Sequence, residues 1–297
     1  MSGTHADNHS TLTTRAALAS MSMALVLLGL KAVAVIQTGS VAMLGSLADT
    51  GLDVLASMVT LFGVRFAAQP ADTNHSFGHG KAEALVAMFQ VFVISLSGIG
   101  IGWEAIARLI GGETATTNPE YGIGVSLIGI VLTGVLVLYQ RSVVRRTGSV
   151  AIHADNVHYQ ADLMINIAVV IAIGLEHFAG VRGADPVFGL LIALWLLYGA
   201  YGASQAAVDQ LMDHEWPEEQ RAAFIKVAEK HPELRGIHDL RTRTSGSLSF
   251  VQFHVWVDGN MTVSEAHRVM DEVEAQLMAE FPNTEVLIHP DPDGHRD

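Results

Sequence analysis

Apolar stretches separated by short polar segments make up the first two thirds of the chain. Six of them are long enough to cross about 30 Å of hydrocarbon, and they lie near residues 14–37, 41–67, 82–110, 121–144, 150–178 and 185–208. The segments between them, such as QTGS and GGETATTNPEYG, carry residues typical of turns. The pattern predicts a polytopic α-helical membrane protein with six transmembrane helices over residues 14–208.

The hydropathy pattern differs on both sides of this region. Residues 1–13 are polar and lack the basic segment of a secretory signal, so we expect a flexible N-terminal tail. After residue 208, alternating and amphipathic segments follow one another: a helix at 218–231, strands at 237–246 and 247–259, a helix at 263–281 and a strand at 284–289. This order predicts an α+β domain (αββαβ, ferredoxin- or metallochaperone-like) over residues 209–291, followed by a C-terminal tail at 292–297.

Composition limits the chemistry that the chain can perform. Half of the residues are hydrophobic and only 16% are charged, as expected for an integral membrane protein. Cysteine is absent, so any bound metal must be held by histidine nitrogens and carboxylate oxygens. From Asp209 onward, 18 acidic and 8 basic residues account for −10 of the net charge of −13. This acidity argues against nucleic acid as a partner.

Basic residues between the apolar stretches indicate the orientation in the membrane. Six predicted spans place both termini on one side. Most of the basic residues fall on that side, namely Arg15, Arg65, Lys81, Arg141, Arg145 and Arg146, against Arg108 and Arg182 on the other. Because lysine and arginine are enriched on the cytoplasmic side, we expect both termini in the cytoplasm.

Two apolar spans carry pairs of ionisable residues at helical spacing. Asp49 and Asp53 are four residues apart in the second span, and His158 and Asp162 repeat this spacing in the fifth. An ionised carboxylate near the membrane centre costs about 2.5–3.5 kcal/mol, so these acids require compensation. Two converging pairs would supply a tetrahedral site for Zn²⁺ or a similar divalent ion.

A structural ion pair is the alternative explanation for these acids. Lys31 in the first span could neutralise one aspartate, and His158 could be an ordinary buried histidine. One lysine cannot neutralise three intramembrane carboxylates, however. The two matching pairs therefore favour a metal site.

Histidines outside the spans form two further candidate groups. The loop QPADTNHSFGHGK carries Asp72, His75 and His79, which fit either a second metal site or an ordinary solvated loop. The C-terminal region adds His238, His254, His267, His289 and Asp291. These lie in different predicted elements, so their spacing alone favours ordinary surface or core histidines over ligands.

Three weaker patterns can be explained by structure alone. Gly98 and Gly102 have the spacing of a close helix contact, which favours simple helix packing. Lys81 and Asp213, which both flank the membrane region on its expected cytoplasmic side, could pair and fix one helix against another. The HADNH sequence at residues 5–9 could bind metal weakly, but a disordered tail is the favoured explanation.

Long motifs carry a resemblance to a known family. The segments LADTGLDVLAS, QPADTNHSFGHGKAEAL, HADNVHYQADLMIN and GIHDLRTRTSG resemble the cation diffusion facilitators, in their bacterial branch. The resemblance extends from about Arg15 to Asp291. It implies a homodimeric transporter of the bacterial inner membrane that exports Zn²⁺ and related ions (Cd²⁺, Fe²⁺, Co²⁺ or Mn²⁺) in exchange for protons.

The resemblance also assigns roles to the candidate residues. It implies that Asp49, Asp53, His158 and Asp162 form the transport site and carry the exchanged protons, and that Asp72, His75 and His79 form a second site. It places His238, His254, His267, His289 and Asp291 in a binuclear zinc site of the cytoplasmic domain, which supports the homodimer. One departure from the family pattern is Pro290, where a glutamine is expected.

Other function classes compete with a proton-coupled antiporter. An intramembrane metallopeptidase needs a catalytic glutamate, often as HExxH. The chain contains one His-Glu pair, at residues 214–215. It continues as HEWPE and lacks the second histidine of the motif, so no enzyme is predicted. A passive divalent-metal channel and a membrane metal sensor remain as alternatives. A channel would conduct without a pH gradient, whereas an antiporter would not.

Overall fold

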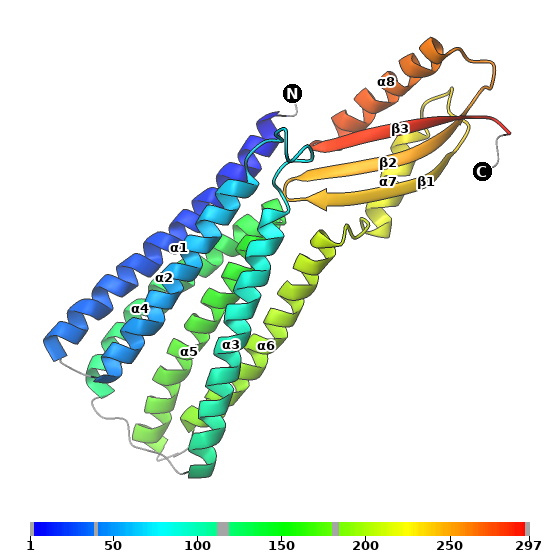
Figure 1. The fold of residues 1–297 in the computed structure, drawn as a ribbon. Helices are drawn as coiled ribbons and strands as arrows, with labels where there is room; N and C mark the ends of the chain where they lie inside the picture. The colour runs from blue at the N-terminus through cyan, green and yellow to red at the C-terminus, as the bar shows by residue number, and fades with distance from the viewer. Residues whose placement is uncertain (1–2, 39–40, 112–118, 180–183, 295–297) are drawn as a thin grey trace. The chain divides into compact units, whose positions relative to one another are not determined.

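The computed structural model describes residues 3–38, 41–111, 119–179 and 184–294 (Figure 1). Six long helices confirm the predicted helical architecture: α1 (Gly3–Thr38), α2 (Val41–Ala67), α3 (Ala82–Gly111), α4 (Pro119–Thr147), α5 (Val150–Ala179) and α6 (Ala184–Leu211). The helix α1 already begins at Gly3, so the segment expected to be a flexible tail is helical. Extending an established helix by one residue costs little compared with nucleating it. Arg182 lies outside the described residues, as do the side chains of residues 5–8.

Five of the six helices contain a stretch that is apolar enough, within the described residues, to cross a membrane. These stretches are His9–Gln37, Ser46–Ala67, Ala82–Gly111, Leu127–Thr147 and Pro186–Leu211. The helix α5 spans 30 residues, but its first half carries His153, Asp155, His158 and Asp162. These polar residues lower its hydropathy, so α5 needs partners among the other helices.

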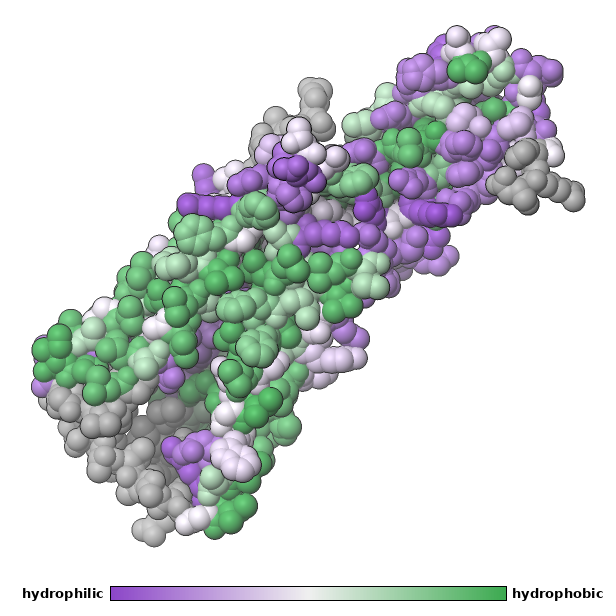
Figure 2. Space-filling model, in the orientation of Figure 1, coloured by the Kyte–Doolittle hydropathy of each residue, from purple (hydrophilic) through white to green (hydrophobic). Residues whose placement is uncertain are grey.

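The chain divides into two compact units. The helical unit comprises Thr11–Ala67 and Ala82–Val208, and the αβ unit comprises Met1–Ser10, Ala68–Lys81 and Asp209–Asp297. The division after Val208 coincides with the predicted domain boundary. The loop between α2 and α3 belongs to the αβ unit, although sequence reasoning assigned it to the membrane domain. Figure 2 shows hydrophobic residues over most of the visible helices and more hydrophilic ones over the αβ unit.

Small and branched apolar side chains join the helices of the helical unit. Ala16 and Ala17 of α1 pack with residues from four other helices, Leu61, Val64, Val86, Val143, Ala151 and Ile152. Gly98 and Gly102 in α3 lie against α6, since a Cβ atom on Gly98 would be 3.3 Å from Leu197 and one on Gly102 would be 3.4 Å from Ala193. Their spacing therefore serves helix packing within one chain.

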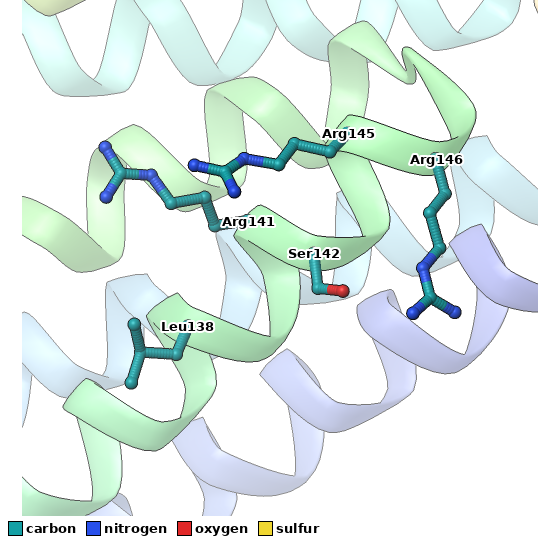
Figure 3. A pocket seen from close by; sticks show the side chains of 5 residues that line it. All are labelled: Leu138, Arg141, Ser142, Arg145 and Arg146. Carbon is teal, nitrogen blue, oxygen red and sulfur yellow. The ribbon is translucent and has the colours of Figure 1, made fainter.

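Three arginines mark the C-terminal end of α4. Arg141, Arg145 and Arg146 line a surface pocket together with Leu138 and Ser142 (Figure 3). The side chains of Arg141 and Arg145 extend to the same side of the helix, and Arg146 extends away from them. Cations in the last turns of a helix interact favourably with its macrodipole, which supports the end of α4 at this position.

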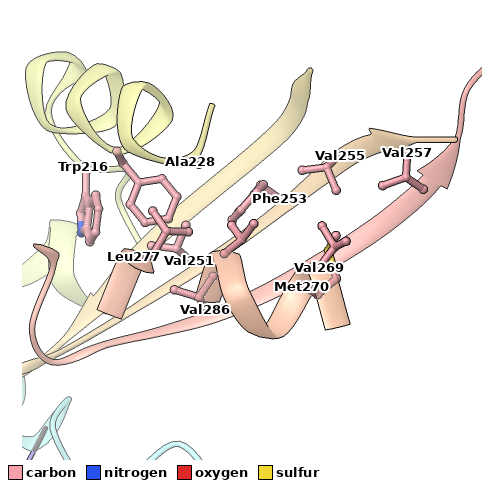
Figure 4. Packing of buried hydrophobic residues seen from close by; sticks show 12 residues of the cluster. Trp216, Ala228, Val251, Phe253, Val255, Val257, Val269, Met270, Leu277 and Val286 are labelled. Atoms are coloured by element: carbon pink, nitrogen blue, oxygen red, sulfur yellow. The ribbon is translucent and has the colours of Figure 1, made fainter. Parts of the chain in front are cut away.

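The C-terminal part of the αβ unit has the predicted αββαβ order. Its elements are α7 (Glu218–Ala228), β1 (Ile237–Ser245), β2 (Leu248–Val257), α8 (Val263–Glu280) and β3 (Thr284–Pro292). Alternate residues of β2, Val251, Phe253, Val255 and Val257, pack against the helices in one core (Figure 4). Phe224 of α7 and Leu277 of α8 are fully buried there. The opposite residues of β2 therefore face away from both helices.

The three strands form one sheet in the order β1-β2-β3. The strands β1 and β2 are antiparallel, and β2 and β3 are parallel. A bulge between His238 and Arg241 shifts the register of β1 by one residue, and Asp239 within it adopts a positive φ of 47°. Such a bulge lets two residues on either side of it point to the same sheet face. A capping box between Thr262 and Glu265 begins α8.

The loop between α2 and α3 is anchored on the sheet of its own unit. Phe77 contacts Phe250 edge-on at 5.5 Å, and the guanidinium of Arg243 lies 4.5 Å from the Phe77 ring. Lys81 donates to Asp213 at 3.0 Å, as the sequence had indicated, and Arg243 reaches the same carboxylate at 3.7 Å. These contacts hold the loop in a defined place beside the turn of the β1–β2 hairpin.

Gly80 is the tightest point of this attachment. A Cβ atom at this position would lie 2.3 Å from the carbonyl oxygen of Ser245, which is too close for any side chain. We expect Gly80→Ala to destabilise the αβ unit by about 1–3 kcal/mol, as overpacked sites do. A thermal unfolding series would measure this loss. Gly100→Ala is the control, because nothing lies within 4 Å of that position, and equal stability of both variants would contradict the prediction.

Candidate metal centres

The first group of ligands lies inside the helical unit, on α2 and α5. Asp53, His158 and Asp162 each offer a ligand atom within 4.8 Å of the others. The Nε2 atom of His158 lies 3.1 Å from Asp53 Oδ1 and 3.8 Å from Asp162 Oδ2. The histidine is buried and the two aspartates are partly buried. Two carboxylates and one imidazole at these distances match the coordination preferences of Zn²⁺.

Asp49 stands apart from this group. It lies one turn before Asp53 on α2 and is exposed, outside the three-residue group. Lys31 does not neutralise the acids by a direct contact: its ammonium donates to Thr50 Oγ1 at 2.6 Å and to the Ser46 carbonyl at 3.3 Å. Thus the described part of the chain brings together three of the four predicted ligands, and the structural ion pair considered for Lys31 does not form.

The second group lies in the loop between α2 and α3. Asp72, His75 and His79 also meet within 4.8 Å, with Asp72 Oδ2 at 3.4 Å from His79 Nε2. The backbone N–H groups of His75 and Asn74 donate to Asp72 Oδ1 at 2.7 and 2.8 Å and lower the pKa of that carboxyl. Asp72 is therefore a carboxylate at neutral pH, as a metal ligand must be.

The third group forms a row across the sheet. In the strand register, His238 of β1 lies opposite His254 of β2, which lies opposite His289 of β3. Two residues further along β3, Asp291 Oδ2 lies 3.1 Å from His238 and 2.9 Å from His254, and Oδ1 lies 3.3 Å from His289. The sheet thereby gathers four of the five predicted residues on the face away from α7 and α8.

Asp291 is the common partner of these histidines. Burial alone would raise the pKa of its carboxyl, but the hydrogen bond from His254 and the charges of His289 and His254 outweigh this and lower it. The ring of Trp256 stacks on the His238 ring at 4.3 Å, which restricts the orientation of that imidazole. A buried carboxylate held among imidazoles is a ready ligand for a divalent cation.

His267 does not join this row within one chain. It lies on α8, on the other side of the sheet, with 76% of its side chain exposed, and it pairs with Asp271 one turn away. Sequence reasoning also missed Trp256 beside the row and a buried polar group around Asp155. Polar residues at Gln90 and Gln140 inside apolar spans were the available signal for that group.

Family models of known proteins match most of the chain. Residues 17–212 match the family model of the cation efflux transmembrane domain, and residues 216–293 match that of the cytoplasmic domain of cation efflux proteins. The cation-efflux pump FieF of Escherichia coli, in strains E24377A and K12, is 42% identical over 281 residues, covering 95% of this chain and 93% of the pump.

Solved structures match a shorter part of the chain. CzrB in its zinc form is 36% identical over 29% of this chain and 98% of that structure, with a TM-score of 0.28. The cytosolic domain of a cation diffusion facilitator protein is 27% identical over 26% of this chain and 93% of that structure, with a TM-score of 0.25.

Proposed function

Because the chain belongs to the cation diffusion facilitator family and is a cation efflux transporter rather than an enzyme, we propose that it exports Zn²⁺ and related divalent ions in exchange for protons. The observation that carries this proposal is the meeting of Asp53, His158 and Asp162 between two membrane helices. Their acidic and imidazole groups have no direct cationic partner among the described residues, so a cation is the natural occupant.

Coupling to protons follows from competition for the same atoms. Carboxylate and imidazole bind a metal only when deprotonated, so a proton arriving at His158, Asp53 or Asp162 displaces the ion. Asp49, one turn away on α2, is the proposed fourth ligand. If α2 and α5 open alternately to the two sides, a cation is loaded from the cytoplasm and released where protons are abundant.

The orientation of the transporter follows the basic residues. Arg141, Arg145 and Arg146 at the end of α4 form a positive cluster, and such clusters stay on the cytoplasmic side. We therefore propose that both termini and the αβ domain lie in the cytoplasm and that the six helices span the bacterial inner membrane. The oxygen and nitrogen ligands suit Zn²⁺, and Cd²⁺, Fe²⁺, Co²⁺ and Mn²⁺ can bind the same atoms and are further candidate substrates.

The αβ domain is proposed to bind zinc between two copies of the chain. His267 is exposed on α8 and is remote from the row of His238, His254, His289 and Asp291. A second copy can supply the missing imidazole, which makes a binuclear site a property of the homodimer. Pro290 stands where the family pattern has glutamine, but its neighbours His289 and Asp291 still pair in register with β2. The group of Asp72, His75 and His79 in the loop between α2 and α3 is proposed as a further site.

Transport in proteoliposomes tests the function. We expect an imposed pH gradient to drive Zn²⁺ uptake against its concentration gradient, because protons leaving the site are replaced by the ion. Collapsing the pH gradient with an ionophore should stop this uphill uptake. Continued conduction down the zinc gradient after the collapse would instead identify a passive channel. Zinc binding without any flux would favour a membrane sensor.

A further inference from the structure

A second buried acid lies in the helical unit, outside the metal group. Asp155 of α5 is fully buried and accepts hydrogen bonds from three other helices. Ser20 of α1 and Gln140 of α4 donate to its Oδ2 atom at 2.6 and 2.7 Å. Gln90 of α3 donates to its Oδ1 atom at 3.3 Å. The carboxyl therefore joins four helices at one point.

Further hydrogen bonds extend this polar cluster to α2. Gln90 Nε2 also donates to Thr60 Oγ1 at 2.7 Å and to the Ala56 carbonyl at 3.2 Å. Gln140 Nε2 lies 2.8 Å from Ser20 Oγ, and Gln140 Oε1 accepts from Asn156 at 3.2 Å. All five of these helices thus contribute to a cluster in which every group apart from Asp155 is uncharged.

The charged surroundings of Asp155 come from α2 and α5. Asp53 of α2 and His158, one turn along α5, are close enough to act on it electrostatically. Ionisable residues on the other helices have other surroundings: Arg15 and Arg141 are exposed, Lys31 donates to Thr50, and Glu83 accepts from Ser149. The hydroxyl of Tyr159 lies against Ser57 and the Ser20 carbonyl. No lysine or arginine among the described residues donates to Asp155.

The cluster satisfies both protonation states of Asp155 without moving a heavy atom. When the carboxyl is ionised, the Ser20 hydroxyl donates to it at 2.6 Å. When the carboxyl carries a proton, its own hydroxyl donates to Ser20 Oγ, and the Ser20 hydroxyl turns to the Ala16 carbonyl at 3.1 Å. A serine hydroxyl can both donate and accept, so no buried donor is left without a partner in either state.

We propose that Asp155 is a proton-binding group of the transporter, separate from the metal ligands; this inference rests on the proposed proton coupling. Arrival of a divalent cation beside His158 favours the ionised carboxyl, so Asp155 releases a proton as the cation binds. It takes up a proton again when the cation leaves. The buried charge created at Asp155 is thereby offset by the charge of the bound cation.

Proton release on zinc binding tests this role. We use the detergent-solubilised protein with the other two sites disabled by Asp72→Ala and Asp291→Ala, in weakly buffered solution with a pH indicator. Against this background, Asp155→Asn should keep zinc binding at the membrane site but release about one proton fewer per zinc ion. Unchanged proton release by folded Asp155→Asn, with the same zinc occupancy, would overturn the proposal.

Two further variants separate a proton site from a merely structural one. Gln90→Met removes a donor but keeps the acid, so it should lower thermal stability and leave the number of released protons unchanged. Asp155→Glu should restore the release that Asp155→Asn loses. A loss of proton release in Gln90→Met equal to that in Asp155→Asn would show that the cluster acts through structure alone.

An infrared measurement covers the case in which Asp155→Asn does not fold. In the protein without this substitution, zinc binding should remove a carbonyl band of a protonated carboxyl, and Ser20→Ala should shift the band because its hydroxyl partner is lost. Absence of any zinc-sensitive carboxyl band that responds to Ser20→Ala would refute the proposal. Failure of the proposed antiport would be seen in a different experiment: zinc uptake by the unmodified protein would be the same with and without a pH gradient.

Discussion

Zinc uptake driven by a pH gradient should fall at least about 100-fold in Asp53→Ala, since even the loss of a residue that only supports a metal ligand costs about 10–100-fold. Asp53 is the α2 member of the group that meets His158 and Asp162. Without it, the two remaining ligands both belong to α5, and α2 holds no ligand within the group. The expected result in proteoliposomes is therefore no uptake above that of empty vesicles.

Leu52→Ala is the matched control for this experiment. Leu52 precedes Asp53 on the same helix, and 61% of it is exposed on the helical unit. Its replacement changes neither charge nor a ligand, so uptake should stay close to that of the unmodified protein. Full activity of Asp53→Ala, at matched protein content in the vesicles, would place the transport site elsewhere.

Zinc should bring the two cytoplasmic domains of a dimer closer together, and Asp291→Ala should remove this response. Each C-terminal region carries a net charge of −10, so two copies repel each other until divalent cations bind between them. Asp291 contacts all three histidines of the row at 2.9–3.3 Å. Its removal should lower zinc affinity in this domain by at least about 10-fold.

Distances between paired labels on the two domains provide the measurement. Asp293→Ala removes the same charge two residues further on, but this side chain is exposed and pairs with Arg235, so the zinc response should persist. If zinc shortened the distance between the labels equally in Asp291→Ala and Asp293→Ala, the row of histidines would not be what brings the two domains together. Because this assay reads the domain alone, it does not depend on transport through the membrane.

Helical spacing explains why much of the membrane site was predictable. Residues four apart on a helix share a face, so Asp53 could be paired with Asp49 and His158 with Asp162 from the sequence alone. The spacing does not determine how α2 is rotated against α5. That rotation brings Asp53 into the group and leaves Asp49 exposed.

The row of histidines was beyond such reasoning. Its members lie on three strands, and strand boundaries were predicted to within a few residues, but a site requires the register of each pair. His254 meets His289 because β3 adds in parallel to β2, which depends on the α8 crossover and on core packing. The cluster around Asp155 could not be predicted from the sequence for a similar reason. An apolar span with one glutamine does not reveal which helix that glutamine will contact.

The bulge in β1 adds one residue to the strand next to His238. On one side of it, Ile237 and His238 pair with Val255 and His254; on the other, Arg241 pairs with Gln252. Residues 239 and 240 together lie opposite one residue of β2, so loss of one of them would restore a regular ladder and leave His238 opposite His254. The hairpin can therefore lose one residue between His238 and Arg241 and still keep His238 in the row of histidines.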